Sequence, residues 1–174
     1  SRAIARKSVE KLVTPADHET YVQPCLSPVW DTALSAHALL ETGDKRAIEL
    51  AGKGLEWLIP LQILDVRGDW ISRRPNVRPG GWAFQFANPH YPDVDDTAVV
   101  AMAMDRYEKL AGTLENDKVD ASARPMRHAI DRGTEWVIGM QSSNGGWGAF
   151  EPENTHLYLN NIPFSDHGAL LDPP

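Results

Sequence analysis

The same ten-residue pattern occurs twice in the chain, 79 residues apart. Residues 53–62 read KGLEWLIPLQ and residues 132–141 read RGTEWVIGMQ, so both place a basic residue, Gly, Glu, Trp, an aliphatic residue and Gln at the same spacing. Each copy runs on to a Gly-rich turn ending in Trp, at 68–70 and at 145–147, and a third such turn, GGWAF, occupies 80–84. Repetition of this kind is typical of stacked, similar units. We expect each Gln to hydrogen-bond to backbone and each Trp to stack, tying a helix end to the following turn.

Helical patterns alternate in character along the chain. Residues 30–41 and 95–111 are apolar on nearly every side, as buried helices are, whereas 45–59 and 124–140 mix charged and apolar residues. A further helical pattern covers residues 1–13. Alternating buried and half-exposed helices predict an all-α fold that is part of an α/α toroid, in which inner helices line a barrel and outer helices wrap it.

The two apolar helices begin alike. Asp31 and Thr32 stand at the start of the first as Asp96 and Thr97 stand at the start of the second. Side-chain oxygens of Asp and Thr accept hydrogen bonds from the free N–H groups at a helix N-terminus. We therefore expect these residues to cap their helices.

Composition excludes several classes of function. The net charge of −7 and the lack of a basic stripe argue against a nucleic-acid partner. A single cysteine, Cys25, excludes an internal disulfide and a multi-Cys metal site. The longest apolar run, 97–104, has eight residues, far short of the roughly 20 that cross a bilayer. Peripheral membrane contact and a homodimer both stay compatible with the sequence.

Three carboxylates, Asp93, Asp95 and Asp96, lie within four positions directly before an apolar helix. Crowding raises the affinity of one of them for a proton, which makes a proton donor available near neutral pH. An EF-hand calcium loop would need Gly and Glu where Ala98 and Met104 stand. No basic residues nearby would hold the phosphates of a magnesium–diphosphate site. The cluster therefore predicts acid chemistry, with no metal and no cofactor, against the plainer interpretation of a solvated helix cap.

Taken together, these motifs resemble the squalene–hopene cyclase family. That family carries repeated Gln-Trp motifs, which residues 132–147 match fully and residues 53–70 match with two extra residues before Gly68. It also carries an Asp-x-Asp-Asp-Thr-Ala acid motif, present here at 93–98. Further blocks similar to the family are SPVWDT at 27–32, GGWAFQF at 80–86 and QSSNGGWGAF at 141–150, so the resemblance covers about residues 20–174.

The resemblance implies that the chain is an internal fragment of a protein several times longer, built from two α/α barrels. Residues 1–22 would be a linker or the end of the preceding barrel, and residues 23–174 the first part of the catalytic barrel. The whole protein would protonate squalene and guide its cationic cyclisation to hopene or hopanol. It would be monotopic, on the cytoplasmic side of the bacterial membrane, and would draw squalene from the bilayer. The chain by itself is expected to be inactive.

The resemblance also implies roles for the acid motif. Asp95 would be the general acid, with Asp93 and Asp96 as its electrostatic partners and the helix N-terminus supplying oriented N–H groups. The family's acid is assisted by a His that, by motif, would lie just beyond residue 174. No motif supports His37, His90 or His128 in its place.

Aromatic residues would guide the carbocation, because a ring face attracts a cation without quenching it. By family motif, Trp30, Phe84 and Phe150 are expected to line the cavity, with Phe84 facing a cation midway through cyclisation. Three alternatives stay open from the sequence: a class II diterpene cyclase, a glycosidase on an α/α barrel, and a non-catalytic α/α module that binds an apolar ligand.

Overall fold

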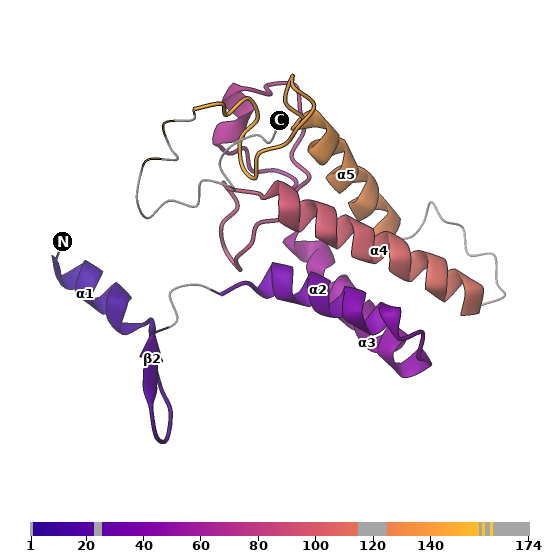
Figure 1. Ribbon diagram of the computed structural model, residues 1–174, viewed down its shortest axis with the longest axis horizontal. Helices are drawn as coiled ribbons and strands as arrows, with labels where there is room; N and C mark the ends of the chain where they lie inside the picture. The colour runs from indigo at the N-terminus through magenta and orange to yellow at the C-terminus, as the bar shows by residue number, and fades with distance from the viewer. Residues whose placement is uncertain (1, 23–25, 115–124, 157, 159–160, 162–174) are drawn as a thin grey trace.

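A computed structural model of the chain describes residues 2–22, 26–114, 125–156, 158 and 161 (Figure 1). Its elements are α1 (Arg2–Glu10), β1 (Val13–Pro15), β2 (Thr20–Val22), α2 (Pro28–Glu41), α3 (Lys45–Leu58), the 3-10 helices η1 (Ile59–Leu61) and η2 (Asp69–Ser72), α4 (Val94–Leu114) and α5 (Pro125–Gly139). Apart from one short hairpin, the regular structure is helical, which confirms the predicted all-α toroid class.

The long helices form two consecutive pairs around a common core. α2 packs on α3 and α4 packs on α5. α4 also contacts both α2 and α3, so it lies between the first pair and α5 (Figure 1). The core contains buried side chains from all four helices, for example Ala33, Leu55, Val100 and Ile130. This arrangement places the start of α4, where the acid motif lies, among segments that follow the other helices.

α3 and α5 are amphipathic, as expected of outer helices. In α3 the buried residues follow one stripe, from Ile48 through Leu55 to Leu58, and the opposite side is charged. An Asp at the start of α3 confirms one capping rule: the Asp44 carboxylate accepts a hydrogen bond from the N–H of Ala47 at 3.0 Å. Burial of one apolar face therefore accounts for the amphipathic pattern of α3 and α5.

The expectation that α2 and α4 are buried on nearly every side is wrong for this chain. Leu34 in α2 is 43% exposed and Met102 in α4 is 63% exposed. Each helix buries the stripe that faces its neighbours, and none of the described residues covers the opposite face. An apolar face of this kind is what an inner helix of a toroid presents to the lumen.

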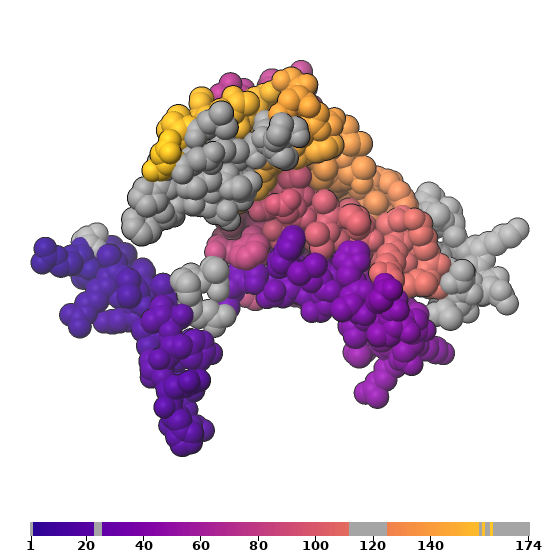
Figure 2. Space-filling view, viewed as in Figure 1, coloured from indigo at the N-terminus to yellow at the C-terminus, as the bar shows by residue number. Residues whose placement is uncertain are grey.

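The N-terminal segment differs from its prediction. α1 ends at Glu10 rather than at residue 13, and Val13 instead begins β1, which pairs antiparallel with β2 (Val13 opposite Val22). α1 has no buried residue, and in Figures 1 and 2 it and the hairpin project away from the helical body. The sequence of the hairpin lacks a clear alternation of apolar and polar residues that would predict two strands.

The second Gln-Trp motif forms the predicted staple. The side-chain amide of Gln141 donates to the carbonyl of Gly145 at 2.8 Å, and the indole N–H of Trp147 donates to the carbonyl of Val137 at 2.7 Å. The end of α5 is thus tied to the turn that follows it. The predicted bond of Gln to backbone and the tie between helix and turn are confirmed, whereas Trp147 contributes its indole N–H and not one of the ring contacts found among the described residues.

In the first motif, the turn that completes the staple is 80–82 and not 68–70. The Gln62 amide donates to the carbonyls of Gly80 (2.7 Å) and Ala129 (2.9 Å), and the Trp82 indole donates to the carbonyl of Leu58 (2.7 Å). Leu58 occupies the same motif position as Val137, so Trp82 is the structural counterpart of Trp147. A Cβ at Gly80 would lie 2.4 Å from the carbonyl oxygen of Arg132, which explains the glycine.

The turn at residues 68–70 (Gly-Asp-Trp) has a different role. Trp70 lies in η2 and packs edge-to-face on Trp136, with ring centroids 6.0 Å apart. Its indole N–H is buried and has no hydrogen-bond partner among the described residues. The motif match at 68–70 is therefore a similarity of sequence without the same structural role. Residues 63–79 form an extra segment between α3 and the turn that completes the staple.

Candidate functional site: the acid motif at the start of α4

Backbone hydrogen bonds from both Trp-containing turns hold the start of α4. The N–H of Asp93 donates to the carbonyl of Trp82 at 2.8 Å, and the N–H of Val94 donates to the carbonyl of Ala149 at 2.8 Å. The Thr97 hydroxyl completes the join, because it accepts from the N–H of Trp82 (2.9 Å) and donates to the carbonyl of Asp93 (2.6 Å). The acid motif is therefore fixed at the meeting point of the two turns.

Asp93 caps α4, which corrects the expectation that Asp96 and Thr97 do so. The Asp93 carboxylate accepts hydrogen bonds from the N–H groups of Asp95 (2.8 Å) and Asp96 (3.3 Å). The helix begins at Val94, so Asp95 and Asp96 lie in its first turn. The N-terminal N–H groups expected to support Asp95 thus support Asp93.

Asp31 is likewise not a cap. α2 begins at Pro28, with Ser27 before it, and Asp31 lies inside the first turn. The Ser27 hydroxyl donates to the Asp31 carboxylate at 2.7 Å. In both helices the repeated Asp-Thr-Ala lies one turn later than a cap would.

The three carboxylates differ sharply in burial. Asp93 is 8% exposed and Asp96 is 2% exposed, whereas Asp95 is exposed to solvent. Burial raises the pKa of Asp93 to about 6, against the opposing effect of the N–H bonds from Asp96 and Asp95. Burial, together with the charges of Asp93 and Asp95, raises the pKa of Asp96 to about 7. Close to neutral pH, the buried pair therefore carries the retained proton.

One oxygen of Asp96 has no obvious role in the fold. Its Oδ1 is buried and has no hydrogen-bond partner among the described residues. An ionised carboxylate with an unpaired, buried oxygen is costly, which favours the protonated form. Within the described part of the chain, no group of three His, Cys, Asp or Glu side chains is arranged to hold a metal ion.

The three predicted aromatic residues lie in different segments, and no ring contact among the described residues joins them to one another. Trp30 in the first turn of α2, Phe84 beyond Trp82 and Phe150 beyond Ala149 are all half-buried. Among the described residues, the ring pairs are Trp57–Phe86, Trp70–Trp136 and His156–Tyr158. The roles of Trp30, Phe84 and Phe150 as cavity lining stay predictions.

Phe150 does line a pocket of about 250 Å³. The other lining residues come from three segments of the chain: Asp69 and Trp70, His90 and Tyr91, and Glu151 and Asn154, which follow Phe150. The Tyr91 hydroxyl donates to the Asp69 carboxylate at 3.3 Å. The sequence had not singled out this grouping, because η2 and residues 150–154 lie about 80 positions apart in the chain.

His37, His90 and His128 lie at three separate places in the structure. His37 is half-buried with its Nε2 3.2 Å from the carbonyl oxygen of Val99, a contact that joins α2 to α4. His128 is exposed on α5, and His90 lines the pocket beside Phe150. The His that the resemblance assigns to the acid would lie outside this chain.

A comparison with protein families identifies the chain. The model of the squalene–hopene cyclase C-terminal domain matches residues 26–174. The chain belongs to the squalene–hopene cyclase family. The resemblance drawn from the motifs is thereby confirmed.

Curated relatives agree with this assignment. A squalene–hopene cyclase of Zymomonas mobilis is 60% identical over 99% of the chain, and one of Bradyrhizobium diazoefficiens is 58% identical over 99% of the chain. A squalene–hopene cyclase of Alicyclobacillus acidocaldarius is 46% identical over 87% of the chain. The chain spans about a quarter of the length of these relatives, which are enzymes (26%, 25% and 22%).

Proposed function

We propose that the protein containing this chain protonates squalene at a terminal alkene and guides the cation through ring closure to hopene, or to hopanol when water ends the sequence. The first outcome is an isomerisation by intramolecular transfer, and the reverse of the second is a lyase reaction. Asp95 delivers the proton, and Asp93 and Asp96 act as its partners. The relatives named squalene–hopene cyclase support this choice of substrate over the diphosphate of a class II diterpene cyclase.

The observation that carries the proposal is the unequal burial of the three carboxylates. An alkene is a very weak base, so its acid must hold a proton and also be strong. Asp95 is the exposed member and can be reached by a substrate, whereas Asp93 and Asp96 are buried with raised pKa values. If the buried pair keeps a proton, Asp95 becomes negative after transfer with less repulsion from its neighbours, which stabilises the product carboxylate.

Aromatic faces would carry the cation once it forms. Trp30, Phe84 and Phe150 come from three different segments; Phe150 directly follows Ala149 and Phe84 comes two residues after Trp82, and the carbonyls of Ala149 and Trp82 are bonded to the start of α4. A desolvated cation over an aromatic ring is stabilised by about 2 kcal/mol or more. No redox group or metal is needed, because the proton and the double bonds of squalene account for every bond formed.

The setting of the whole protein is also part of the proposal. Squalene is a hydrocarbon that partitions into lipid, so we place the enzyme on the cytoplasmic side of the bacterial membrane as a monotopic protein. Within the described ranges, none of the helices has the length and apolar character needed to span a bilayer. We propose that the chain alone is inactive, because the lumen-type faces at Leu34 and Met102 lie open and the relatives are about four times longer.

The test uses the full-length parent, meaning the protein of the relatives' length that contains this chain. It is assayed in detergent with squalene and separately with geranylgeranyl diphosphate, and products are read by gas chromatography–mass spectrometry. We expect a pentacyclic product from squalene that disappears in Asp95→Asn. A product from the diphosphate alone would contradict the substrate, and activity retained in Asp95→Asn would contradict the acid.

A control separates loss of chemistry from loss of fold. Asp31→Asn changes a carboxylate of the same kind in the matching Asp-Thr-Ala of α2, and should keep the product. A non-catalytic binding module would give no product from any variant.

A further inference from the structure

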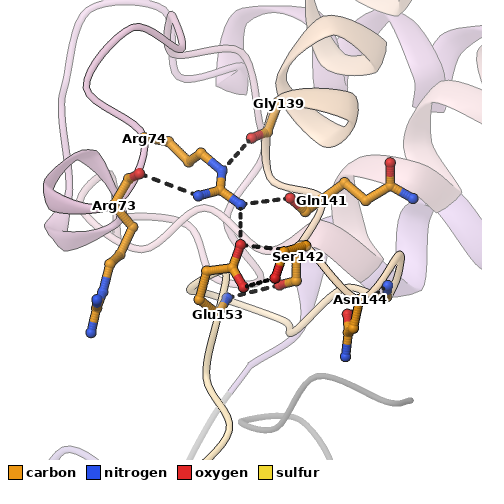
Figure 3. A network of polar contacts seen from close by, with 9 residues as sticks. Arg73, Arg74, Gly139, Gln141, Ser142, Asn144 and Glu153 are labelled. Atoms are coloured by element: carbon orange, nitrogen blue, oxygen red, sulfur yellow. Dashed lines mark hydrogen bonds and ion pairs between the residues drawn. The ribbon is translucent and has the colours of Figure 1, made fainter.

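Arg74 and Glu153 form an ion pair that belongs neither to the acid motif nor to the Gln-Trp staples. Arg74 follows η2, and its guanidinium donates to the carbonyls of Gly139 (3.0 Å) and Gln141 (2.6 Å) at the end of α5. The same group donates to the Glu153 carboxylate at 2.9 Å. Figure 3 shows the guanidinium enclosed between these carbonyls, that of Arg73 and the carboxylate.

Glu153 closes the loop that follows α5. Its carboxylate accepts from the N–H of Ser143 (2.9 Å) and from the Ser143 hydroxyl (2.8 Å), and its own N–H donates to the Ser142 hydroxyl at 2.8 Å. Residues 142–143 and 153 are thus pinned together, so residues 144–152 form a closed loop. We call the group of Arg74, Ser142, Ser143 and Glu153 the loop clamp.

The clamp is more sheltered than the other ion pairs in the described part of the chain. The side chains of Arg74 and Glu153 are 23% and 31% exposed, whereas every other described pair has at least one side chain more than a third exposed. Sheltered, charge-assisted hydrogen bonds to several partners hold geometry better than a surface pair does. The Arg74 guanidinium, with help from Ser143, also holds the pKa of the Glu153 carboxyl below its usual range.

The backbone at Glu153 is strained in a way that the clamp offsets. Its φ of 62° is the one left-handed value at a non-glycine residue in the described ranges. This conformation disfavours residues with a Cβ by roughly 1–2 kcal/mol. The Glu at this position makes four hydrogen bonds, three accepted by its carboxylate and one donated by its N–H, which offset the strain.

The closed loop carries two elements of the candidate site. Ala149 accepts the hydrogen bond from Val94 at the start of α4, and Phe150 follows it. Phe150 lines the 250 Å³ pocket together with Trp70. Arg74 is itself tied to Trp70, because its backbone N–H donates to the Trp70 carbonyl at 3.1 Å. The clamp therefore connects the loop that carries Phe150 to the segment that carries Trp70, and the same loop is bonded to the start of α4 through Ala149.

From this connection we propose that Arg74 and Glu153 are positioning residues, which set where Phe150 stands relative to the acid and so decide how completely the substrate is cyclised. The proposal rests on the function proposed above. Neither residue touches substrate; both act through the loop. An aromatic wall held slightly out of place leaves a mid-reaction cation less stabilised, and a displacement of 1 Å can cost about a hundredfold in rate. A cation that is not carried forward loses a proton from a neighbouring carbon and ends as a partly cyclised alkene.

The experiment compares Glu153→Gln and Arg74→Lys in the full-length parent with squalene. We expect the ratio of partly to fully cyclised product to rise, and kcat for the complete product to fall about tenfold, with KM changed less than about twofold. Ser143→Ala, which removes one bond to the carboxylate, should shift the ratio in the same direction by less. This milder variant keeps the test decisive if Glu153→Gln does not fold.

Glu135→Gln is the matched control. Glu135 lies on α5 and also binds an arginine of the segment before residue 80, since Arg78 Nε donates to it at 2.9 Å, and its second partner is Arg132 on the same helix (2.6 Å). It should leave the product ratio unchanged. A change in thermal stability with no change in product ratio in the clamp variants would overturn the proposal and leave the clamp purely structural. If the parent itself forms no cyclic product, the proposed function fails. If the parent is active and the clamp variants keep its product ratio, only the positioning role fails.

Discussion

Replacing Asp96 by Asn should remove a specific pH dependence of stability. The pKa of Asp96 rises from its ordinary value of 3.8 to about 7, because the side chain is buried beside two other carboxylates. At pH 7 about half of the folded molecules would hold this proton, against about one in a thousand for an ordinary Asp. The difference corresponds to about 4 kcal/mol as an upper value.

The sign follows from proton linkage. Between about pH 4 and pH 7 the folded chain binds more protons at Asp96 than the unfolded chain does, so the free energy of unfolding falls as the pH rises through this range. Asp93, with a pKa raised to about 6, acts in the same direction. Asn cannot ionise, so Asp96→Asn should be the less pH-sensitive protein and the more stable one on the alkaline side.

The assay is urea unfolding of the chain at about pH 5 and about pH 8, followed by circular dichroism. Asp95→Asn is the control, because Asp95 lies at the surface of the same turn. Infrared spectroscopy adds a direct readout, since a carbonyl band of a protonated carboxyl should disappear with a midpoint near pH 7 and be missing in Asp96→Asn. Equal pH dependence in all three proteins, with no such band, would refute the argument that burial keeps this proton.

Two further predictions test the packing around the motif. Trp82→Phe should cost about 1–3 kcal/mol more than Trp70→Phe, because the first leaves the carbonyl of Leu58 without its donor and the second removes an indole N–H that has no partner in the described part of the chain. Urea unfolding of both variants measures the difference, and equal losses would contradict the corrected staple. Gln62→Ala should cost about 1–3 kcal/mol through its two bonds to backbone, whereas Gln141→Ala, exposed and with one bond, should cost less than about 1 kcal/mol.

Helix location could be predicted from the sequence because it depends on local patterns. The expected range 45–59 differs from α3 by one residue, and 124–140 differs from α5 by one at each end. Amphipathic stripes and an Asp cap act within one helix, so no distant residue is needed to place them. The prediction failed at α1, where residues 11–13 leave the helix for a hairpin that helical periodicity does not reveal.

Assigning the first staple required tertiary information. The turns at 68–70 and 80–82 both read Gly-x-Trp, and the nearer one fits the family spacing better. What separates them is the partner of the indole N–H: Trp82 donates to Leu58, whereas Trp70 has no partner among the residues that the structure describes. Gln62 also reaches Ala129 on α5, 67 positions away, and a contact over that separation has no local signature.

The acid motif shows most clearly how far residue order can carry an argument about chemistry. Three aspartates within four positions predict a shared proton, but which carboxyl holds this proton depends on which side chains the fold buries. The sequence alone does not distinguish the three carboxylates, but the helix does. Its first turn buries Asp96 and exposes Asp95, while Asp93 accepts hydrogen bonds from the free N–H groups. The buried carboxyls therefore retain a proton near neutral pH, and Asp95 is the member exposed to solvent. If Asp95 is the acid, its strength comes from neighbours that stay neutral, and mutating Asp96 should alter the pH dependence of catalysis more than it alters substrate binding.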